Sequence, residues 1–116
     1  MIAGRAAAVC LPPGKVVRTG LVLHGEASWY GAYFHGRETT NGERFDMFFA
    51  HTCAHRELPF GTWLLVTHGD RELMVRVNDR GPFSGNRFLD LSWAGACALG
   101  IDAVAEVTAE ICVAGV

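Results

Sequence analysis

Residues 71–82 have the sequence Arg71-Glu72-Leu73-Met74-Val75-Arg76-Val77-Asn78-Asp79-Arg80-Gly81-Pro82. In the first seven residues, apolar side chains alternate with Glu72, Met74 and Arg76. This period of two predicts a half-buried β-strand. Thr62–Thr67 is a second apolar run, and His68-Gly69-Asp70 between the two has the composition of a turn. We therefore expect a β-hairpin over residues 62–77, and the Asn-Asp-Arg-Gly-Pro sequence ends its second strand abruptly.

The flanking segments predict more short elements. Towards the C-terminus, Ser92 is a good helix N-cap, residues 93–99 form a short helix, and Gly100 occupies the C-cap position. Residues 105–113 alternate again and predict the last strand. Towards the N-terminus, residues 26–30 read as a strand and residues 31–43 as a loop, after which Asp46 caps one helical turn. Several short strands with one or two short helices indicate a mainly β protein, a small barrel.

Bulk composition limits both the architecture and the function. A length of 116 residues fits one domain, and a hydrophobic fraction of 50% allows one compact core. The formal net charge of -2 argues against a general nucleic-acid binder and against docking on an anionic membrane. No apolar run approaches the roughly 20 residues that span a bilayer. The four cysteines show no zinc-site spacing, so we expect no metal.

The segment before the predicted domain, residues 1–24, leaves two interpretations open. Arg5, a short alanine run and Cys10 resemble the end of a lipoprotein signal, but the apolar stretch is shorter than a working signal core. Either the segment is a processed signal remnant with a lipid anchor at Cys10, or Cys10 is an ordinary residue. Four cysteines allow three pairings, and Cys53 with Cys97 is one of them. Without oxidation, Cys97 reads as a small buried residue of the helix.

Two residues are candidates for acid–base chemistry. Asp79 follows a predicted strand within a Gly-Pro turn, where rigid backbone can hold a carboxylate at the barrel rim. The alternative is a turn aspartate that bonds its own backbone or pairs with Arg80. His55 precedes another strand and could relay a proton near neutral pH. The alternative is a partly buried histidine satisfied by backbone; a metal pair with His51 would need further ligands.

A second set of residues could bind sugar. Glu43 and Asp46 follow the Asn41-Gly42 turn, and carboxylates accept hydrogen bonds from sugar hydroxyls. The alternatives are a solvated Glu43 and an Asp46 that only caps its turn. Tyr30 is the aromatic candidate for stacking on a sugar ring, whereas Trp29 reads as core. We also take Arg80, beside Asp79, as a candidate substrate-binding residue.

Five segments in order resemble the rare lipoprotein A-like (RlpA-like) domain family. The match runs from about Gly25 to Ile111. The segments are Gly25-Glu26-Ala27-Ser28-Trp29-Tyr30-Gly31, Thr40-Asn41-Gly42-Glu43-Arg44-Phe45-Asp46, Ala54-His55-Arg56-Glu57-Leu58-Pro59-Phe60-Gly61-Thr62, Val77-Asn78-Asp79-Arg80-Gly81-Pro82-Phe83 and Arg87-Phe88-Leu89-Asp90-Leu91-Ser92.

The resemblance implies a six-stranded double-psi β-barrel over residues 25–116. It implies a protein of the cell envelope, on the periplasmic side and often an outer-membrane lipoprotein. Characterised members are lytic transglycosylases that cleave peptidoglycan glycan strands lacking stem peptides and leave 1,6-anhydro ends. By this resemblance Asp79 is the acid–base residue, His55 supports it, and Glu43 and Asp46 line the groove. No cofactor is expected, the partner is the glycan strand, and the domain is expected to act as a monomer.

Two departures from the family pattern keep an alternative function open. The interval from Asp46 to His55 is one residue longer than is usual, and the turn at residues 68–70 is short. A displaced groove wall favours a non-catalytic module that binds peptidoglycan or another polysaccharide. A scaffold for envelope proteins and a metal hydrolase are further rivals. Mass spectrometry of digested glycan separates cleavage from binding, because only cleavage creates anhydro ends.

Overall fold

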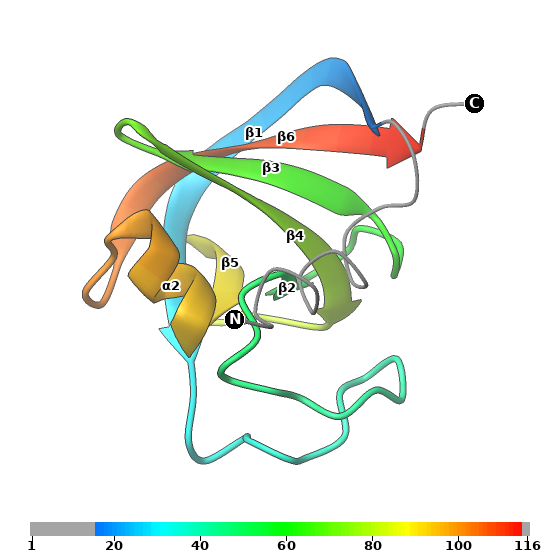
Figure 1. Cartoon of the computed structure of the whole chain (residues 1–116), viewed down its shortest axis with the longest axis vertical. Coiled ribbons are helices and arrows are strands. Elements are labelled where there is room, and N and C mark those ends of the chain that lie inside the picture. Colours follow the sequence, from blue (N-terminus) through cyan, green and yellow to red (C-terminus); the bar gives the residue numbers. More distant parts are fainter. Residues whose placement is uncertain (1–15, 115–116) are drawn as a thin grey trace, which may run out of the picture.

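A computed structural model of the chain describes residues 16–114, which form six strands and one helix. In chain order these are β1 (Val16–Tyr30), β2 (Thr52–His55), β3 (Trp63–His68), β4 (Arg71–Asp79), β5 (Arg87–Ser92), α2 (Trp93–Leu99) and β6 (Ala105–Ala114). The strands close a barrel in the order β1-β5-β2-β4-β3-β6, with β6 returning to β1 (Figure 1). The predicted mainly β, six-stranded barrel is confirmed, with one short helix in the described part.

Both parallel pairs of the barrel join strands that are distant in sequence. β1 pairs with β5, and β2 pairs with β4, while the four other neighbouring pairs are antiparallel. β2 and β5 are antiparallel to each other and lie between β1 and β4. Because neighbours in this order are not consecutive in the chain, the connections cross from one strand to another. They place the ends of β1, β2 and β4 together at one side of the barrel. That side carries the long segment 31–51 (Figure 1).

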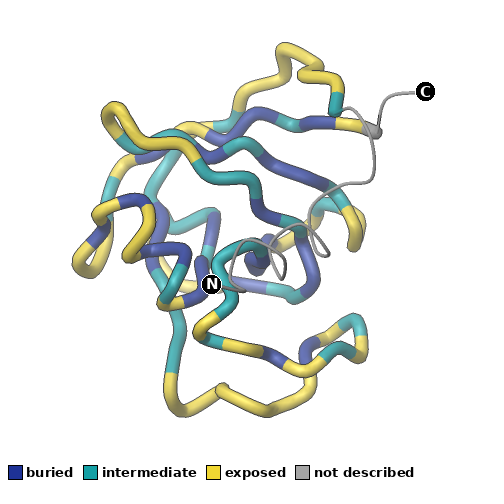
Figure 2. The backbone as a smooth tube through the Cα atoms, viewed as in Figure 1, coloured by how far each residue is buried: buried dark blue, intermediate teal, exposed yellow. Residues whose placement is uncertain are grey.

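The predicted hairpin is confirmed as β3 and β4, joined by a turn at Gly69 and Asp70. Val75 and Val77 are fully buried in the core, whereas Glu72 is exposed and Arg76 half-buried on the other face. Leu64 and Val66 of β3 complete this part of the core. The inward faces of the strands are buried and the hairpin end is exposed (Figure 2). The period-two pattern therefore identified the inner face of the barrel.

Helix α2 has the predicted caps. The Ser92 hydroxyl accepts a hydrogen bond from the Gly95 amide at 3.0 Å, and Gly100 is in the left-handed conformation with φ of 71°. Ser92 also donates to the Phe49 carbonyl at 2.7 Å, and the Ala94 amide donates to the Met47 carbonyl at 2.9 Å. These bonds attach the segment before β2 to the start of the helix.

Three local features differ from the sequence-based expectation. β1 begins at Val16 rather than Glu26, because residues 16–18 and 22–27 pair with β6 around an interruption at Gly20. β2 has only four residues, all buried, and its sequence shows no alternation that could announce a strand. Asp46 caps a non-helical turn in place of the predicted helical turn. Its Oδ1 accepts a hydrogen bond from the Phe48 amide at 2.9 Å.

The cysteines in the described residues are reduced. Cys53 and Cys112 are buried and Cys97 is exposed, so the pairing of Cys53 with Cys97 does not form. The expectation of a buried Cys97 was wrong, because α2 turns that side of its short length outward with Trp93. Cys10 and the question of a lipid anchor lie outside the described residues. Between Val16 and Ala114, no helix has the length and apolar character needed to cross a bilayer.

Candidate active site

The Asp79 carboxylate is fixed at the end of β4 by donors from three directions. Its Oδ1 accepts a hydrogen bond from the Thr40 amide at 3.0 Å, from the Thr40 hydroxyl at 2.6 Å and from the Arg80 amide at 2.9 Å. An ionised carboxylate only accepts hydrogen bonds, and the three groups around this oxygen are all donors. The bond with its neighbour Arg80 is the local turn contact that the sequence suggests, but Thr40 lies far away in the chain. Asp79 is half-buried.

The other oxygen of Asp79 faces Tyr30. The Tyr30 hydroxyl donates to Oδ2 at 3.4 Å, which is long for an O–H···O bond. Burial and then the negative charge of Asp79 raise the pKa of Tyr30 well above its usual range, so the phenol stays a donor. Its ring stacks on Phe45, with centroids 4.2 Å apart. Tyr30 therefore contacts the candidate acid, and its ring is already occupied by an aromatic neighbour.

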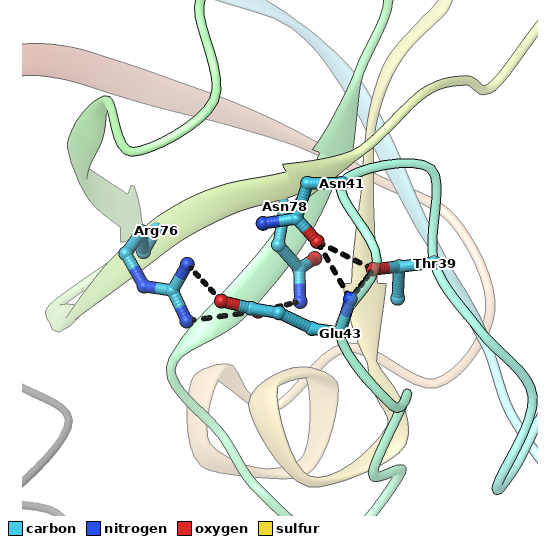
Figure 3. A network of polar contacts seen from close by, with 5 residues as sticks. All are labelled: Thr39, Asn41, Glu43, Arg76 and Asn78. Atoms are coloured by element: carbon cyan, nitrogen blue, oxygen red, sulfur yellow. Dashed lines mark hydrogen bonds and ion pairs between the residues drawn. The ribbon is translucent and has the colours of Figure 1, made fainter.

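Glu43 is held in a network that joins segment 39–43 to β4 (Figure 3). Arg76 donates to both of its oxygens, Nη1 to Oε2 at 2.9 Å and Nη2 to Oε1 at 3.0 Å, and Asn78 donates to Oε1 at 3.0 Å. Burial opposes the charge, but these bonds outweigh it and lower the pKa of Glu43. Glu43 is therefore a fixed carboxylate rather than a solvated side chain.

The Glu43 network forms the wall of a pocket of about 410 Å³. Its lining includes Asp46, Phe49 and Thr52 as well as Glu43, Arg76 and Asn78. Glu43 and Asp46 thus share one pocket. Asn78, the neighbour of Asp79 in the chain, also lines it. Asn78 is buried, and its Oδ1 has no hydrogen-bond partner among the described residues.

His55 lies at the end of β2, and its imidazole faces another pocket. Nδ1 accepts hydrogen bonds from the Glu57 and Leu58 amides, both at 3.1 Å, so the proton of the neutral ring is on Nε2. Burial, together with the charges of Arg80 and Arg56, lowers the pKa of His55. The ring lines a pocket of about 610 Å³ with Phe88, Pro59 and residues 22–24. Within residues 16–114, no hydrogen bond connects this ring to the Asp79 carboxylate.

Arg80 connects the two candidate residues through the backbone. Its Nη1 donates to the Leu58 carbonyl at 2.8 Å and to the His55 carbonyl at 3.2 Å, and its guanidinium lies over the Phe60 ring at 3.9 Å. The His55 ring orders the same segment by accepting the Glu57 and Leu58 amides. His55 therefore helps to place Arg80, which follows Asp79 in the chain.

Asp90 is an acidic residue of this region that the sequence reasoning did not single out. Leu89 and Leu91 on either side are fully buried in the core, so Asp90 points to the outer face of β5. Ser28 on β1 donates a short hydrogen bond to its Oδ1. Burial raises the pKa of Asp90, Ser28 and Arg87 oppose this rise, and the charge of Asp79 adds to it. The isolated polar residue between two leucines is the sequence signal that could have identified it.

The described residues contain no cluster of three or more histidine, cysteine or acidic side chains arranged to hold a metal ion. His51 bonds the Met74 carbonyl through Nδ1 at 2.7 Å, which accounts for its position without a ligand. The chemistry available to these residues is that of carboxyl groups, a neutral imidazole and fixed hydrogen-bond donors.

A family model described as lytic transglycolase matches residues 22–111, which covers most of the barrel and every residue of this site. The chain belongs to this lytic transglycolase family. It is similar to the probable endolytic peptidoglycan transglycosylase RlpA of Synechocystis sp., with 57% identity over 79 residues, 66% of this chain and 24% of that protein. The endolytic peptidoglycan transglycosylase RlpA of Neisseria meningitidis is 54% identical over 78 residues, 66% of this chain and 32% of that protein.

Another relative covers more of this chain. The endolytic peptidoglycan transglycosylase RlpA of Campylobacter jejuni is 48% identical over 98 residues, 83% of this chain and 34% of that protein. The chain therefore spans about a quarter to a third of the length of these relatives. Among solved structures, the Streptomyces papain inhibitor aligns with a TM-score of 0.63 at 19% identity, covering 82% of this chain and 97% of that one. This likeness supports the fold alone.

Proposed function

We propose that this domain is a peptidoglycan lytic transglycosylase of the cell envelope, which cleaves glycan strands lacking stem peptides and leaves 1,6-anhydro ends. The observation that carries the proposal is the fixed Asp79 carboxylate beside the Glu43 pocket, in a chain whose relatives are named endolytic peptidoglycan transglycosylases. The glycan strand is the proposed partner, and the periplasmic side of the envelope is the proposed location.

The reaction needs one group that can both give and take a proton. Protonated Asp79 gives its proton to the glycosidic oxygen as the bond to the anomeric carbon breaks. The C6 hydroxyl of the same muramic acid residue attacks that carbon, and the Asp79 carboxylate takes the hydroxyl proton. No water is consumed, the proton balance closes, and the product carries a 1,6-anhydro ring. General acid–base help of this kind is worth roughly 10²–10⁴-fold.

The other site residues have supporting roles in this proposal. Glu43 and Asp46 offer acceptors to sugar hydroxyls from the wall of their pocket. Tyr30 orients Oδ2 of Asp79. His55 acts as a positioning residue, because its ring orders residues 57–58, whose chain in turn holds Arg80 next to Asp79.

The Asp79→Asn substitution tests the proposal. The amide keeps the size of the side chain but cannot carry the proton, so the release of 1,6-anhydro ends from peptide-free glycan strands is expected to fall at least roughly 10²-fold. Asp70→Asn, in the exposed β3–β4 turn, is the matched control and should keep the wild-type rate. Unfolding curves confirm that both variants fold. Release of anhydro ends by Asp79→Asn at the wild-type rate would contradict the assignment.

The rival is a binding module without turnover, and the position of His55 in a pocket that Asp79 does not line favours it. Mass spectrometry after incubation of the wild-type chain with glycan strands distinguishes the two. Anhydro ends support the enzyme. Strands that co-sediment with the protein but keep their original ends support the binding module.

A further inference from the structure

Four strands place Asp79 and Asp90 in one transverse row. Ala54 on β2 is the register partner of Asp79 on β4 and also of Asp90 on β5, and Asp90 is the partner of Ser28 on β1. The register of β2 against β4 shifts between Cys53 and Ala54, so the shared face is established from β1. Ser28 bonds Asp90 and the Tyr30 hydroxyl contacts Asp79, and Ser28 and Tyr30 lie on the same face of β1. Two strand spacings put the Cα atoms of the two aspartates roughly 10 Å apart. Ala54 on β2 lies between them.

The two carboxyl groups have different sets of hydrogen-bond partners. Asp79 accepts two backbone amides and two hydroxyls. Asp90 is half-buried like Asp79, and Ser28 is its one side-chain partner among the described residues. The pair shares one outer face of the barrel with Tyr30, whose hydroxyl contacts Asp79. Burial and then the charges of Asp79 and Asp90 raise the pKa of Tyr30.

We infer that Asp90 is the second carboxyl group of the site, a positioning residue whose negative charge helps Asp79 to keep its proton. The inference rests on the proposed function, in which Asp79 must begin each turnover with a proton. Two nearby carboxyl groups resist double ionisation, so a pair keeps one proton at a pH where a lone aspartate would lose it.

The groups facing Asp90 come from each strand packed around it. Arg87 on its own strand favours the charged form, Ser28 on β1 bonds it, and Asp79 on β4 opposes its ionisation. Tyr30 on β1 and Cys53 on β2 stay neutral, since burial raises the pKa of each. The balance between Arg87 and Asp79 therefore decides when Asp90 releases its proton, and substitution of Asp79 changes that balance.

Carboxyl ¹³C NMR titration tests the coupling without reference to activity. In Asp79→Asn, the titration midpoint of Asp90 is expected to move to lower pH than in the wild type, because the neighbouring negative charge is gone. Asp70→Asn should leave this midpoint where it is. An Asp90 midpoint that is the same in the wild type and in Asp79→Asn would overturn the inference, even if the chain cleaves glycan.

The pH profile of cleavage by Asp90→Asn tests the role in catalysis. The alkaline limb of the profile should move towards acid, with activity near the wild-type level at the acid end. A profile that superimposes on that of the wild type would overturn the inference. So would a folded Asp90→Asn variant that is inactive at every pH, because Asp90 would then act on the substrate itself. If the wild type releases no anhydro ends, the proposed function fails while the NMR titration still decides the coupling.

Discussion

The hydroxyl and the backbone amide of Thr40 both donate to Oδ1 of Asp79, at 2.6 and 3.0 Å, although the two residues lie 39 positions apart in sequence. Together with the bonds from Arg76 and Asn78 to Glu43, they tie segment 39–43 to the last four residues of β4. The candidate acid and the wall of the neighbouring pocket therefore depend on one loop–strand junction.

Removing the Thr40 hydroxyl should loosen the candidate acid without unfolding the barrel. Thr40→Val deletes one of the bonds to Asp79 and keeps the backbone bond, so anhydro-end release should fall about tenfold, the value of one hydrogen bond to a charged group. Thr108→Val, at an exposed position of β6, is the control and should cleave normally. Equal rates for the two variants would mean that the hydroxyl does not orient Asp79.

The Glu43–Arg76 pair should contribute measurably to stability because it is bidentate. A double-mutant cycle with Glu43→Gln and Arg76→Met is expected to give a coupling free energy of unfolding of about 1 kcal/mol, at the upper end for partly exposed ion pairs. Urea unfolding at low ionic strength measures it. The coupling should shrink in 1 M salt if it is electrostatic. Additive effects of the two substitutions would show that the contact contributes nothing net.

Protonation of His55 should destabilise the fold at acid pH. Because the folded-state pKa of His55 is lowered, the unfolded chain binds more protons as the pH falls below the ordinary histidine value of about 6.5. Its stabilising contribution is therefore complete above that pH and is lost as the pH falls to the folded-state pKa. His55→Asn keeps an acceptor for the Leu58 amide but does not titrate. The free energy of unfolding of this variant should decline less than that of the wild type as the pH falls below the ordinary histidine value of about 6.5. Parallel curves would remove His55 as the cause.

The Ser92 hydroxyl bonds two backbone groups. Its removal should therefore lower the free energy of unfolding by more than the removal of a simple helix cap. Ser92→Ala leaves the Gly95 amide and the Phe49 carbonyl without this partner and should cost about 2 kcal/mol of unfolding free energy. Exposed Ser84→Ala is the control. Amide hydrogen exchange around residues 47–50 should also become faster in Ser92→Ala. Unchanged exchange there would show that the helix start does not anchor this segment.

Much of the barrel could be predicted because its hairpin and helix follow local rules. The alternation in β4, the Ser92 cap and Gly100 each carry their signal within a few residues. The extent of β1 and the existence of β2 could not be predicted in this way. Residues 16–18 become strand only by pairing with β6, about ninety positions away, and β2 is buried on both faces between β5 and β4. Long-range pairing of this kind leaves no periodic pattern in the segment itself.

The same distinction holds for the site. Asp79 and Glu43 stand in conspicuous turn sequences, and the structure gives each a dense set of partners. The bonding of Glu43 to Arg76 spans 33 positions and joins a loop to a strand, so spacing alone gives no hint of it. His55 was expected beside Asp79, but the pleat of β2 turns its ring away from the face that Ala54 shares with Asp79. Asp90 was overlooked because nothing in its own segment shows that β2 separates it from Asp79 by a single alanine.

The two oxygens of Asp79 accept different numbers of hydrogen bonds, three at Oδ1 and one at Oδ2. Oδ1 is saturated by Thr40 and Arg80, so a proton, or a hydroxyl seeking an acceptor, finds room only at Oδ2, on the side of Tyr30. A sugar approaching from the side of Tyr30 would contact Oδ2. One approaching from the Thr40 side would contact Oδ1, whose acceptor positions are already bonded to Thr40 and Arg80. In the proposed reaction, only the lateral face of a glycan chain that reaches Oδ2 would be cut.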